Sequence, residues 1–294
     1  MEKRNLSLKI VTLLYFLLLL SCTEKKEIKV EEKKFRKVTV AAIQCSSRMG
    51  QKEYNFQKIS KLVREASEKS AKIIVLPEAA LSGYMDPSKD ITWTREEPGE
   101  GEMKVQDVAE SVNGEFVKKY LKLADDLNIF LTVPFIEQND NKFFNTVLLV
   151  SPEGKILIHH RKKALWTQGD GSWCSEGDID PKVVETEYGR LGVMICYDVH
   201  YMPEKLKKLK ADIVLYSVGW YGPNTEDWYK RRFPEKYVVP NNFSVVAANW
   251  SHEQDSQGWI GCGSSNIVYK NGIVIKITEK TAGDTIVTAQ LPLD

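Results

Sequence analysis

The sequence predicts a single domain of α/β (α+β) class over residues 38–294, and three observations support this prediction. Apolar runs of strand length alternate with segments whose apolar residues recur at helical spacing. Two pairs of apolar runs flank short glycine-containing turns, a pattern typical of β-hairpins. No repeat, low-complexity tract or internal linker interrupts this pattern, and the segment has the length of one domain.

The first half of this segment alternates between predicted strands and predicted helices. The strands show alternating or continuous apolar residues, and the helices show apolar residues at every third or fourth position. In order, these elements are a strand over 38–42, a helix over 59–66, a strand over 73–76, a helix over 116–127 and a strand over 129–133. The strand over 73–76 ends at Pro77, which cannot continue a strand ladder.

The second half reads mostly as strands. Apolar runs flank the turns at 152–154 and 270–272, so each turn is expected to close a hairpin. Three further apolar runs, at 193–196, 213–216 and 245–248, predict interior strands of a buried sheet.

Composition excludes several classes of protein. The chain has 294 residues, 43% of them hydrophobic and 28% charged, which argues against a disordered or collagen-like chain. The 41 basic residues nearly balance the 40 acidic ones, and the formal net charge is +1. Because the chain carries no basic field, nucleic acid is not expected as a partner.

Residues 1–21 have the pattern of a secretory signal peptide. A basic start is followed by an apolar run over 10–20 that is too short to span a bilayer comfortably. The run ends in Leu19-Leu20-Ser21-Cys22, which resembles the bacterial lipobox. The resemblance implies cleavage before Cys22, lipidation of this residue and an extracytoplasmic protein anchored to a bacterial membrane. The alternative is an ordinary signal peptide with an incidental cysteine.

Residues 22–37 are expected to form a charged tether after the lipidated cysteine. The segment contains no Gly or Pro and few apolar residues, so it has little to bury. Fully extended, it would reach roughly 50 Å, enough to hold a domain clear of a membrane surface. A short surface helix is the alternative conformation.

Three chemically reactive side chains follow predicted buried strands or hairpins: Glu78, Lys162 and Cys196. Each is a weak signal alone, because such carboxylates and lysines are usually solvated and a cysteine in an apolar run is usually inert. The combination is more specific, since a thiol needs a base or a depressed pKa before it can act as a nucleophile.

This combination resembles the nitrilase, or carbon–nitrogen hydrolase, superfamily along nearly all of residues 38–294. The motifs that carry the resemblance are, in order, Pro77-Glu78, Ser82-Gly83-Tyr84, Arg161-Lys162, Glu176-Gly177-Asp178, Tyr188-Gly189-Arg190-Leu191-Gly192, Ile195-Cys196-Tyr197-Asp198, Ala248-Asn249 and Gly263-Ser264-Ser265. The resemblance implies a four-layer α-β-β-α sandwich of the nitrilase type in a single domain. It also implies a homodimer or a higher homo-oligomer formed by stacking sheets.

The same resemblance implies that Glu78, Lys162 and Cys196 are the catalytic residues. Glu78 would take the proton of Cys196 and then pass it to the departing amine. Lys162 and the backbone N–H of Tyr197 would stabilise the oxyanion. The implied activity is hydrolysis of a linear amide or carbamoyl substrate, and it requires neither a metal nor an organic cofactor.

Two departures from the family pattern are visible. Many relatives carry a second glutamate seven residues before the glycine of a Gly-Asp pair, and this chain has Asp170 there. Either Asp170 substitutes with shorter reach or the auxiliary role is absent. The loop over 199–204 is also one residue longer than is usual, with His200 near a position where relatives often have Arg. His200 is expected to be a solvated loop residue, with substrate contact as the alternative.

Aromatic residues gather in the loops around the implied site, where they either pack between layers or contact substrate. They are Tyr84, Trp166, Trp173, Trp220 and Tyr221. Trp220 is the best candidate for substrate contact, because family members often place an aromatic residue there. Arg231 and Arg232, in contrast, are expected to form structural ion pairs on a helix.

The remaining cysteines leave one alternative open. Cys45 is expected to be buried at the end of the first strand. Cys174 and Cys262 fall in loops, and an extracytoplasmic compartment would permit a disulfide between them. The sequence does not supply the geometry that such a bond requires.

Three functional interpretations follow. The first is an amidase-type hydrolase, which the Cys196-Tyr197-Asp198 motif favours over the Cys-Trp-Glu usual in true nitrilases. The second is a nitrilase or an acyl-transferring member of the same superfamily. The third is a non-catalytic surface lipoprotein that uses the fold for binding, and the intact set of Glu78, Lys162 and Cys196 argues against it.

Overall fold

The computed structural model describes residues 36–84, 105–167, 169–220, 227–252 and 261–293, and one compact unit begins at Arg36. The expected signal peptide, Cys22, the tether up to residue 35 and Tyr221 lie outside the described residues. Within the described ranges, no helix has the length and apolar character needed to cross a membrane.

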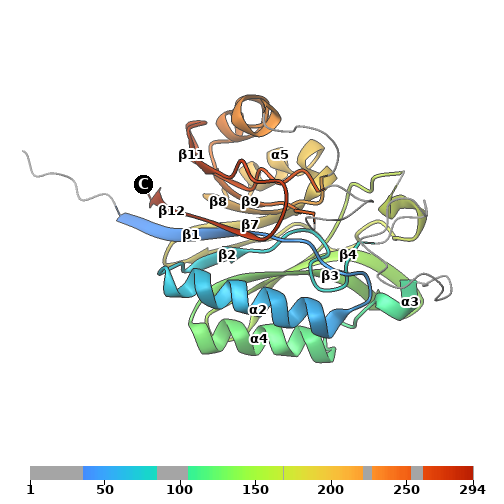
Figure 1. Cartoon of the computed structure of the whole chain (residues 1–294). Helices are drawn as coiled ribbons and strands as arrows, with labels where there is room; N and C mark the ends of the chain where they lie inside the picture. The colour runs from blue at the N-terminus through green and yellow to red at the C-terminus, as the bar shows by residue number, and fades with distance from the viewer. Residues whose placement is uncertain (1–35, 85–104, 168, 221–226, 253–260, 294) are drawn as a thin grey trace, which may run out of the picture. The chain divides into compact units, whose positions relative to one another are not determined.

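Two six-stranded mixed sheets form the centre of the unit (Figure 1). The first sheet has the order β12-β1-β2-β3-β4-β5, and the second has the order β11-β10-β9-β8-β7-β6. The strands of the first sheet are β1 (Arg36–Gln44), β2 (Ile73–Val75), β3 (Phe130–Asn139), β4 (Lys142–Val150), β5 (Ile156–Arg161) and β12 (Thr285–Leu293). The strands of the second are β6 (Val183–Thr186), β7 (Gly189–Ile195), β8 (Ile213–Ser217), β9 (Ser244–Ala248), β10 (Asn266–Val268) and β11 (Val274–Ile277). Strands β1, β2 and β3 run parallel, and so do β7, β8 and β9.

Helices cover the outer face of each sheet, which gives four layers. The first sheet is covered by α2 (Lys52–Glu68) and α4 (Glu115–Leu127), and the short α3 (Val105–Val108) packs at one end of β3 (Figure 1). The second sheet is covered by α5 (Pro203–Lys208) and by helical turns over 228–241. The expected α-β-β-α sandwich of the nitrilase type is therefore confirmed.

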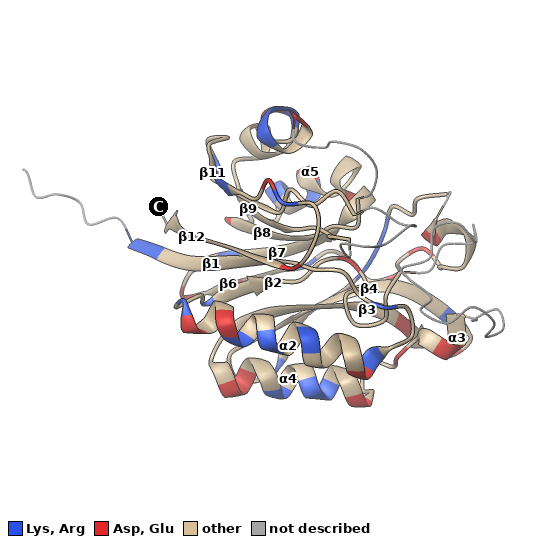
Figure 2. Ribbon diagram, in the orientation of Figure 1, with Lys and Arg blue, Asp and Glu red and all other residues tan. Residues whose placement is uncertain are grey.

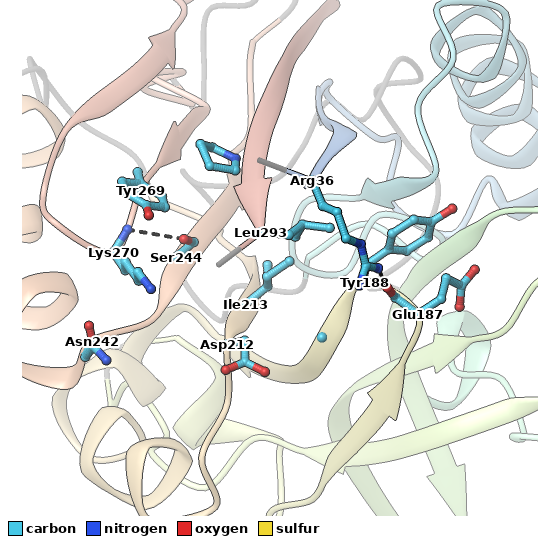
Figure 3. Close-up of a pocket in the computed structure, with 12 residues that line it drawn as sticks. Arg36, Glu187, Tyr188, Asp212, Ile213, Asn242, Ser244, Tyr269, Lys270 and Leu293 are labelled. Carbon is cyan, nitrogen blue, oxygen red and sulfur yellow. Dashed lines mark hydrogen bonds between the residues drawn. The ribbon is translucent and has the colours of Figure 1, made fainter. Parts of the chain in front are cut away.

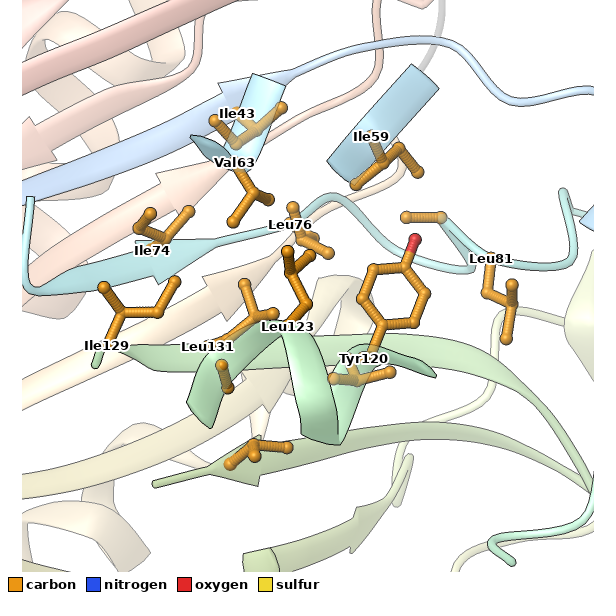
Figure 4. Close-up of a cluster of buried hydrophobic side chains, with 14 of the residues drawn as sticks. Ile43, Ile59, Val63, Ile74, Leu76, Leu81, Tyr120, Leu123, Ile129 and Leu131 are labelled. Carbon is orange, nitrogen blue, oxygen red and sulfur yellow. The ribbon is translucent and has the colours of Figure 1, made fainter. Parts of the chain in front are cut away.

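Three apolar clusters hold these layers together. Figure 4 shows the first, in which Ile59 and Val63 of α2 pack with Tyr120 and Leu123 of α4 over the first sheet. The second cluster fills the space between the sheets, and the third lies beneath α5 and the 228–241 turns. Full burial of one such apolar side chain stabilises the folded state by about 1.5–3 kcal/mol. The charged residues of α2 and α4 lie on the outer side of these helices (Figure 2).

The predicted strands and helices are present, with several differences in extent. β1 begins at Arg36, inside the expected tether, because Arg36 and Lys37 pair with Leu293 and Pro292 of β12. β3 continues past residue 133 into an unpredicted hairpin with β4, which turns at Asp140 with a φ of +53°. β6 and β12 were also not predicted, because they are half-buried strands without strict alternation.

Candidate active site

The three predicted reactive residues meet at one end of the sandwich. Glu78 follows β2, Lys162 directly follows β5, and Cys196 directly follows β7. Strands β2 and β7 belong to different sheets, and the backbone N–H of Glu78 donates to Val218 O, which follows β8, the parallel neighbour of β7. This bond joins the loop after β2 to the carboxyl end of the second sheet. A hydrogen bond joins Lys162 to Glu78, and the charge of Glu78 acts on the thiol of Cys196.

Lys162 lies between two carboxylates. Its side chain is 1% exposed, and Nζ donates to Glu78 Oε1 at 2.8 Å and to Asp170 Oδ2 at 2.6 Å. Burial lowers the pKa of Lys162, but the charges of Glu78 and Asp170 outweigh it and hold the pKa well above its ordinary value of 10.5. Lys162 is therefore a permanent buried cation.

Glu78 is fixed by its backbone and by one of its two oxygens. Its N–H donates to Val218 O at 3.1 Å, and its carbonyl accepts Trp250 Nε1–H at 2.7 Å. Oε1 accepts from Lys162 and from Asn145 Nδ2, the latter at 2.7 Å. Among the described residues, Oε2 accepts no hydrogen bond and so is the atom available for a proton.

The environment of Glu78 suits a proton carrier. Burial raises its pKa most strongly, Lys162 opposes the rise, and Asp170 adds to it, so the pKa lies above the ordinary value of 4.5. A carboxyl group with a raised pKa can both accept and return a proton near neutral pH.

Cys196 occupies a strained turn at the end of β7. Its φ is +37°, in the left-handed region, which costs about 1–3 kcal/mol for a residue with a side chain. The hydroxyl of Tyr216 donates to its carbonyl at 2.7 Å and holds this conformation. Burial and then the charge of Glu78 raise the pKa of the thiol well above 9.0, so the thiol is protonated at neutral pH and needs a base.

Gly219 permits the close approach of the base and the thiol. Its carbonyl oxygen is 3.8 Å from Cys196 Sγ. A Cβ atom at Gly219 would lie 2.4 Å from Glu78 Oε2 and equally close to the indole of Trp250. Any larger residue would therefore displace the carboxyl group of Glu78.

Asp170 completes the charged cluster. Its side chain is fully buried, and Oδ2 accepts from Asn145 Nδ2 at 3.0 Å in addition to Lys162. Oδ1 accepts the backbone N–H of Trp166 at 2.8 Å, and the N–H of Asp170 donates to the hydroxyl of Tyr84 at 2.9 Å. Asp170 thus reaches Lys162 despite being one methylene shorter than glutamate.

We expect Asp170→Ala to reduce kcat by at least tenfold while the protein remains folded. The ammonium of Lys162 would lose its shortest ion pair and could turn away from the reacting carbonyl. Steady-state ammonia release and thermal melting check this prediction. Asp178→Ala is the matched control, because it also removes an aspartate that pairs with a cation but on an exposed surface. An unchanged rate in Asp170→Ala would show that this chain lacks the auxiliary role.

Asp198 fastens the segment after Lys162 to the segment that carries Cys196. Its Oδ1 accepts the backbone N–H groups of Lys163 and Ala164, both at 2.9 Å. Its Oδ2 accepts the N–H of Ile195 at 3.1 Å and contacts His160 Nε2 at 2.8 Å. Burial raises the pKa of Asp198, but the contact with His160 outweighs it and lowers the pKa. This carboxylate therefore positions the segment that follows Lys162 against the segment that carries Cys196.

Arg161, the neighbour of Lys162, has a structural role. Its guanidinium forms two hydrogen bonds with the buried Glu137 and one with Asp178 at 2.7 Å, and it stacks 3.9 Å above the ring of Phe144. Burial raises the pKa of Glu137, but bonds with His159 and Arg161 outweigh it and lower the pKa to about 2. This ion pair anchors the end of β5, where Lys162 begins.

The remaining predicted site residues lie beside this cluster. Tyr197 is in the first turn of the 3₁₀ helix Cys196–His200, where backbone N–H groups have no intrahelical acceptor, and the residue is 38% exposed. Trp220 follows Gly219 and is half-buried, and its backbone N–H donates to Asn249 Oδ1 at 2.9 Å. His200 is exposed and contacts the hydroxyl of Tyr237 at 2.8 Å.

The other predicted aromatic residues serve mainly in packing. Tyr84 is buried and packs edge-on against Trp250 and Trp173, while Trp166 and Trp173 are half-buried. Arg231 and Arg232 form the expected surface ion pairs, both with Asp227.

The disulfide alternative for Cys174 and Cys262 is wrong, because both are free cysteines. Cys174 Sγ accepts the N–H of Asn145 at 3.1 Å, and Cys262 Sγ donates to Trp220 O at 2.8 Å. Cys45 is buried as expected. Burial raises the pKa of Cys45 and of Cys174 to about 12, so neither is a reactive thiolate.

Sequence reasoning missed Asn145 and Trp250. Asn145 lies on β4 and bridges the carboxylates of Glu78 and Asp170, and the detectable signal was a polar residue inside a buried strand. Trp250 is fully buried and holds the backbone of Glu78. A tryptophan directly after the Ala248-Asn249 motif gave no sign of this contact.

The described residues contain no group of three or more His, Cys, Asp or Glu side chains that could hold a metal ion. A separate cavity of about 420 Å³ lies where β7, β8 and β9 begin, the end opposite to the active site (Figure 3). Arg36 and Asp212 are among the residues that line it, and the N–H of Lys270 donates to Ser244 Oγ there at 3.2 Å.

Comparisons with known proteins agree with this geometry. Residues 39–294 match the family model described as carbon-nitrogen hydrolase. The omega-amidase NIT2 of Xenopus tropicalis is 25% identical over 253 residues, which are 83% of this chain and 84% of the relative. A nitrilase of Pyrococcus abyssi is 27% identical over 233 residues, 76% of this chain and 79% of the relative.

Solved structures share the fold. An amidase from Nesterenkonia sp. superposes with a TM-score of 0.72 at 20% identity and covers 87% of this chain and 91% of its own. Variants of that enzyme have been solved with butyramide and with the acetamide moiety of fluoroacetamide covalently attached to the active-site cysteine. Because the family model spans most of the sequence and the Glu, Lys and Cys of the predicted triad lie together, the chain belongs to the carbon–nitrogen hydrolase family.

Proposed function

We propose that this protein hydrolyses a linear amide or carbamoyl compound through a thioacyl-enzyme on Cys196. The observation that carries the proposal is the buried Lys162, held between Glu78 and Asp170 beside a thiol on a strained turn. The amidase and omega-amidase names among the relatives support the same reaction class.

In the first half-reaction, Glu78 Oε2 takes the proton of Cys196 while Sγ attacks the substrate carbonyl carbon. The carbonyl electrons move to oxygen, where Lys162 Nζ and the backbone N–H of Tyr197 stabilise the negative charge. Collapse breaks the C–N bond, and the nitrogen takes the proton from Glu78 and leaves as neutral ammonia or amine. A thioester on Cys196 remains.

In the second half-reaction, Glu78 removes a proton from a water molecule, and the oxygen attacks the thioester carbonyl. Collapse breaks the C–S bond, and the sulfur takes the proton back from Glu78 as the acid product leaves. One carboxyl group performs both transfers, which is consistent with a pKa raised toward neutrality.

The test is ammonia or amine release across a panel of ω-amides, carbamoyl amino acids and nitriles. Release from amides or carbamoyl compounds supports the proposal, and release from nitriles alone would favour the nitrilase alternative. Appearance of a new amide when an amine acceptor is added would favour acyl transfer. A panel with no turnover and no labelling of Cys196 by thiol reagents would favour a binding protein.

We also propose that Cys22 is lipidated and anchors the enzyme outside the cytoplasm. The lipobox-like run that ends at Cys22 carries this proposal, and the charged residues that follow suit a tether. Expressed with its leader, the protein is expected to partition into detergent. The Cys22→Ser variant should either be released from the membrane or keep its leader. Detergent phase separation reports the release, and the mass of the chain reports whether the leader has been removed. Equal solubility of both forms would contradict the anchor.

Association into a homodimer or a higher homo-oligomer remains part of this proposal, since the family commonly stacks its sheets between subunits. Light scattering coupled to size exclusion measures the mass directly. A monomer at micromolar concentration would contradict it.

A further inference from the structure

Tyr229 carries a buried hydroxyl group that the reaction scheme does not use. The side chain is fully buried in the helical turn Trp228–Arg232. Its hydroxyl has no hydrogen-bond partner among the described residues. A buried polar group without a partner costs about 1–3 kcal/mol, so such groups usually have a reason to persist.

The surroundings of Tyr229 connect it to the active site. Its ring lies edge-on to Trp220, with ring centroids 6.2 Å apart, and Trp220 directly follows the glycine whose carbonyl contacts Cys196 Sγ. The ring centroid of Tyr229 is also 5.9 Å from that of Phe233, and Phe233 stacks on Tyr216. The hydroxyl of Tyr216 donates to the carbonyl of Cys196.

The reactive groups of the site also act electrostatically on the hydroxyl of Tyr229. Burial raises the pKa of Tyr229 well above its ordinary value of 10.0, and Cys262, Cys196 and Glu78 add to the rise in that order. These groups belong to the loops around the nucleophile, so the hydroxyl is within electrostatic reach of both the thiol and the base. A phenol with so high a pKa is neutral and acts as a hydrogen-bond donor.

We infer that Tyr229 is a specificity-determining residue whose hydroxyl donates a hydrogen bond to a polar group on the acyl chain of the substrate. The inference rests on the proposed amidase function. The preferred substrates are therefore amides whose acyl chain bears a hydrogen-bond acceptor, such as a hydroxyl or a carboxylate, and not purely aliphatic amides. A substrate without that acceptor leaves the hydroxyl unpaired in the closed pocket, which weakens binding.

The experiment compares matched pairs of amides with wild-type enzyme and with Tyr229→Phe. β-Hydroxypropionamide is paired with butyramide, and succinamate is paired with isocaproamide, so each pair differs only in polar atoms. Wild-type enzyme is expected to prefer the polar member of at least one pair by about tenfold or more in kcat/KM. Tyr229→Phe is expected to lose most of this preference by a fall of about tenfold on the polar member.

Tyr120→Phe is the matched control. The hydroxyl of Tyr120 is equally buried and also lacks a partner among the described residues, but it lies in the cluster between α2, α4 and the first sheet. Both variants should melt at or above the wild-type temperature, because each removes a buried hydroxyl that bonds to none of the described residues. Only Tyr229→Phe should change the substrate preference.

The possible failures are distinct. If wild-type enzyme turns over amides but shows no preference for the polar members, the inference is wrong. It is also wrong if Tyr229→Phe keeps the preference, or if Tyr120→Phe changes it as much. If no amide or carbamoyl compound releases ammonia or amine, the proposed function itself fails and the inference falls with it.

Discussion

Cys196→Ala is expected to abolish turnover, and Cys196→Ser should nearly abolish it. The alanine variant has no nucleophile, and a serine hydroxyl is far harder for the carboxylate of Glu78 to deprotonate than a thiol. Glu78 must already deprotonate a thiol whose pKa is raised in this site. A serine hydroxyl is a still weaker acid than this thiol, so Glu78 is too weak a base to ionise it. Both variants should remain folded, because each change is confined to one atom whose hydrogen bond to Gly219 O is long, at 3.8 Å.

The decisive measurement is intact mass after a rapid quench with a slowly hydrolysed amide. The mass of the wild-type enzyme should increase by that of one acyl group, and the modified peptide should contain Cys196. Cys45→Ala is the matched control, because its thiol is buried in the core away from the pocket and should form no adduct. Full activity in Cys196→Ala would end the thioacyl scheme.

Lys162→Ala should lower kcat/KM by at least 10²-fold, about 3 kcal/mol or more of transition-state stabilisation. The change removes the oxyanion cation and also leaves Glu78 and Asp170 buried together without a counter-ion. The charge of Asp170 raises the pKa of Glu78 and Lys162 opposes that rise, so part of the loss should appear as a shift of the pH profile. Lys163→Ala is the control, since within the described part of the chain Lys163 Nζ donates only to the carbonyl of Gly177.

The pH profile gives Glu78 a separate signature. The base works in its ionised form, so activity is present above the pKa of Glu78 and is lost as the pH falls through it. Burial raises this pKa above 4.5, and the acid limb of kcat/KM should therefore lie above the ordinary carboxyl range. The limb should move to still higher pH in Lys162→Ala, and Glu78→Gln should be inactive throughout. An acid limb at or below 4.5 would argue against Glu78 as the base.

Much of the fold and the charged cluster could be predicted from local patterns. Strand-length apolar runs placed β2, β7, β8 and β9 correctly, and polar residues at their ends marked Glu78 and Cys196. These signals are local because a buried strand requires continuous apolar sequence.

Contacts between distant segments could not be predicted in this way. β12 is defined by its antiparallel pairing with β1, which lies near the other end of the sequence. Its own residues are mostly half-buried, so they lack the alternation that indicates a strand. Asn145 acts through the direction in which β4 presents its side chain, which depends on register. The separation of Cys174 from Cys262 depends on loop geometry, and the unpaired hydroxyl of Tyr229 is defined only by what surrounds it.

Because β1 and β2 run parallel, the start of β1 and the loop after β2 lie at opposite ends of the sheet. The chain enters β1 at Arg36, beside the starts of β7 and β8, whereas Glu78 lies past the far end of β2. Nine residues of strand separate these levels by roughly 30 Å. A resin or a fusion partner joined at Arg36 would therefore be attached at the end of the fold opposite to Glu78 and Cys196.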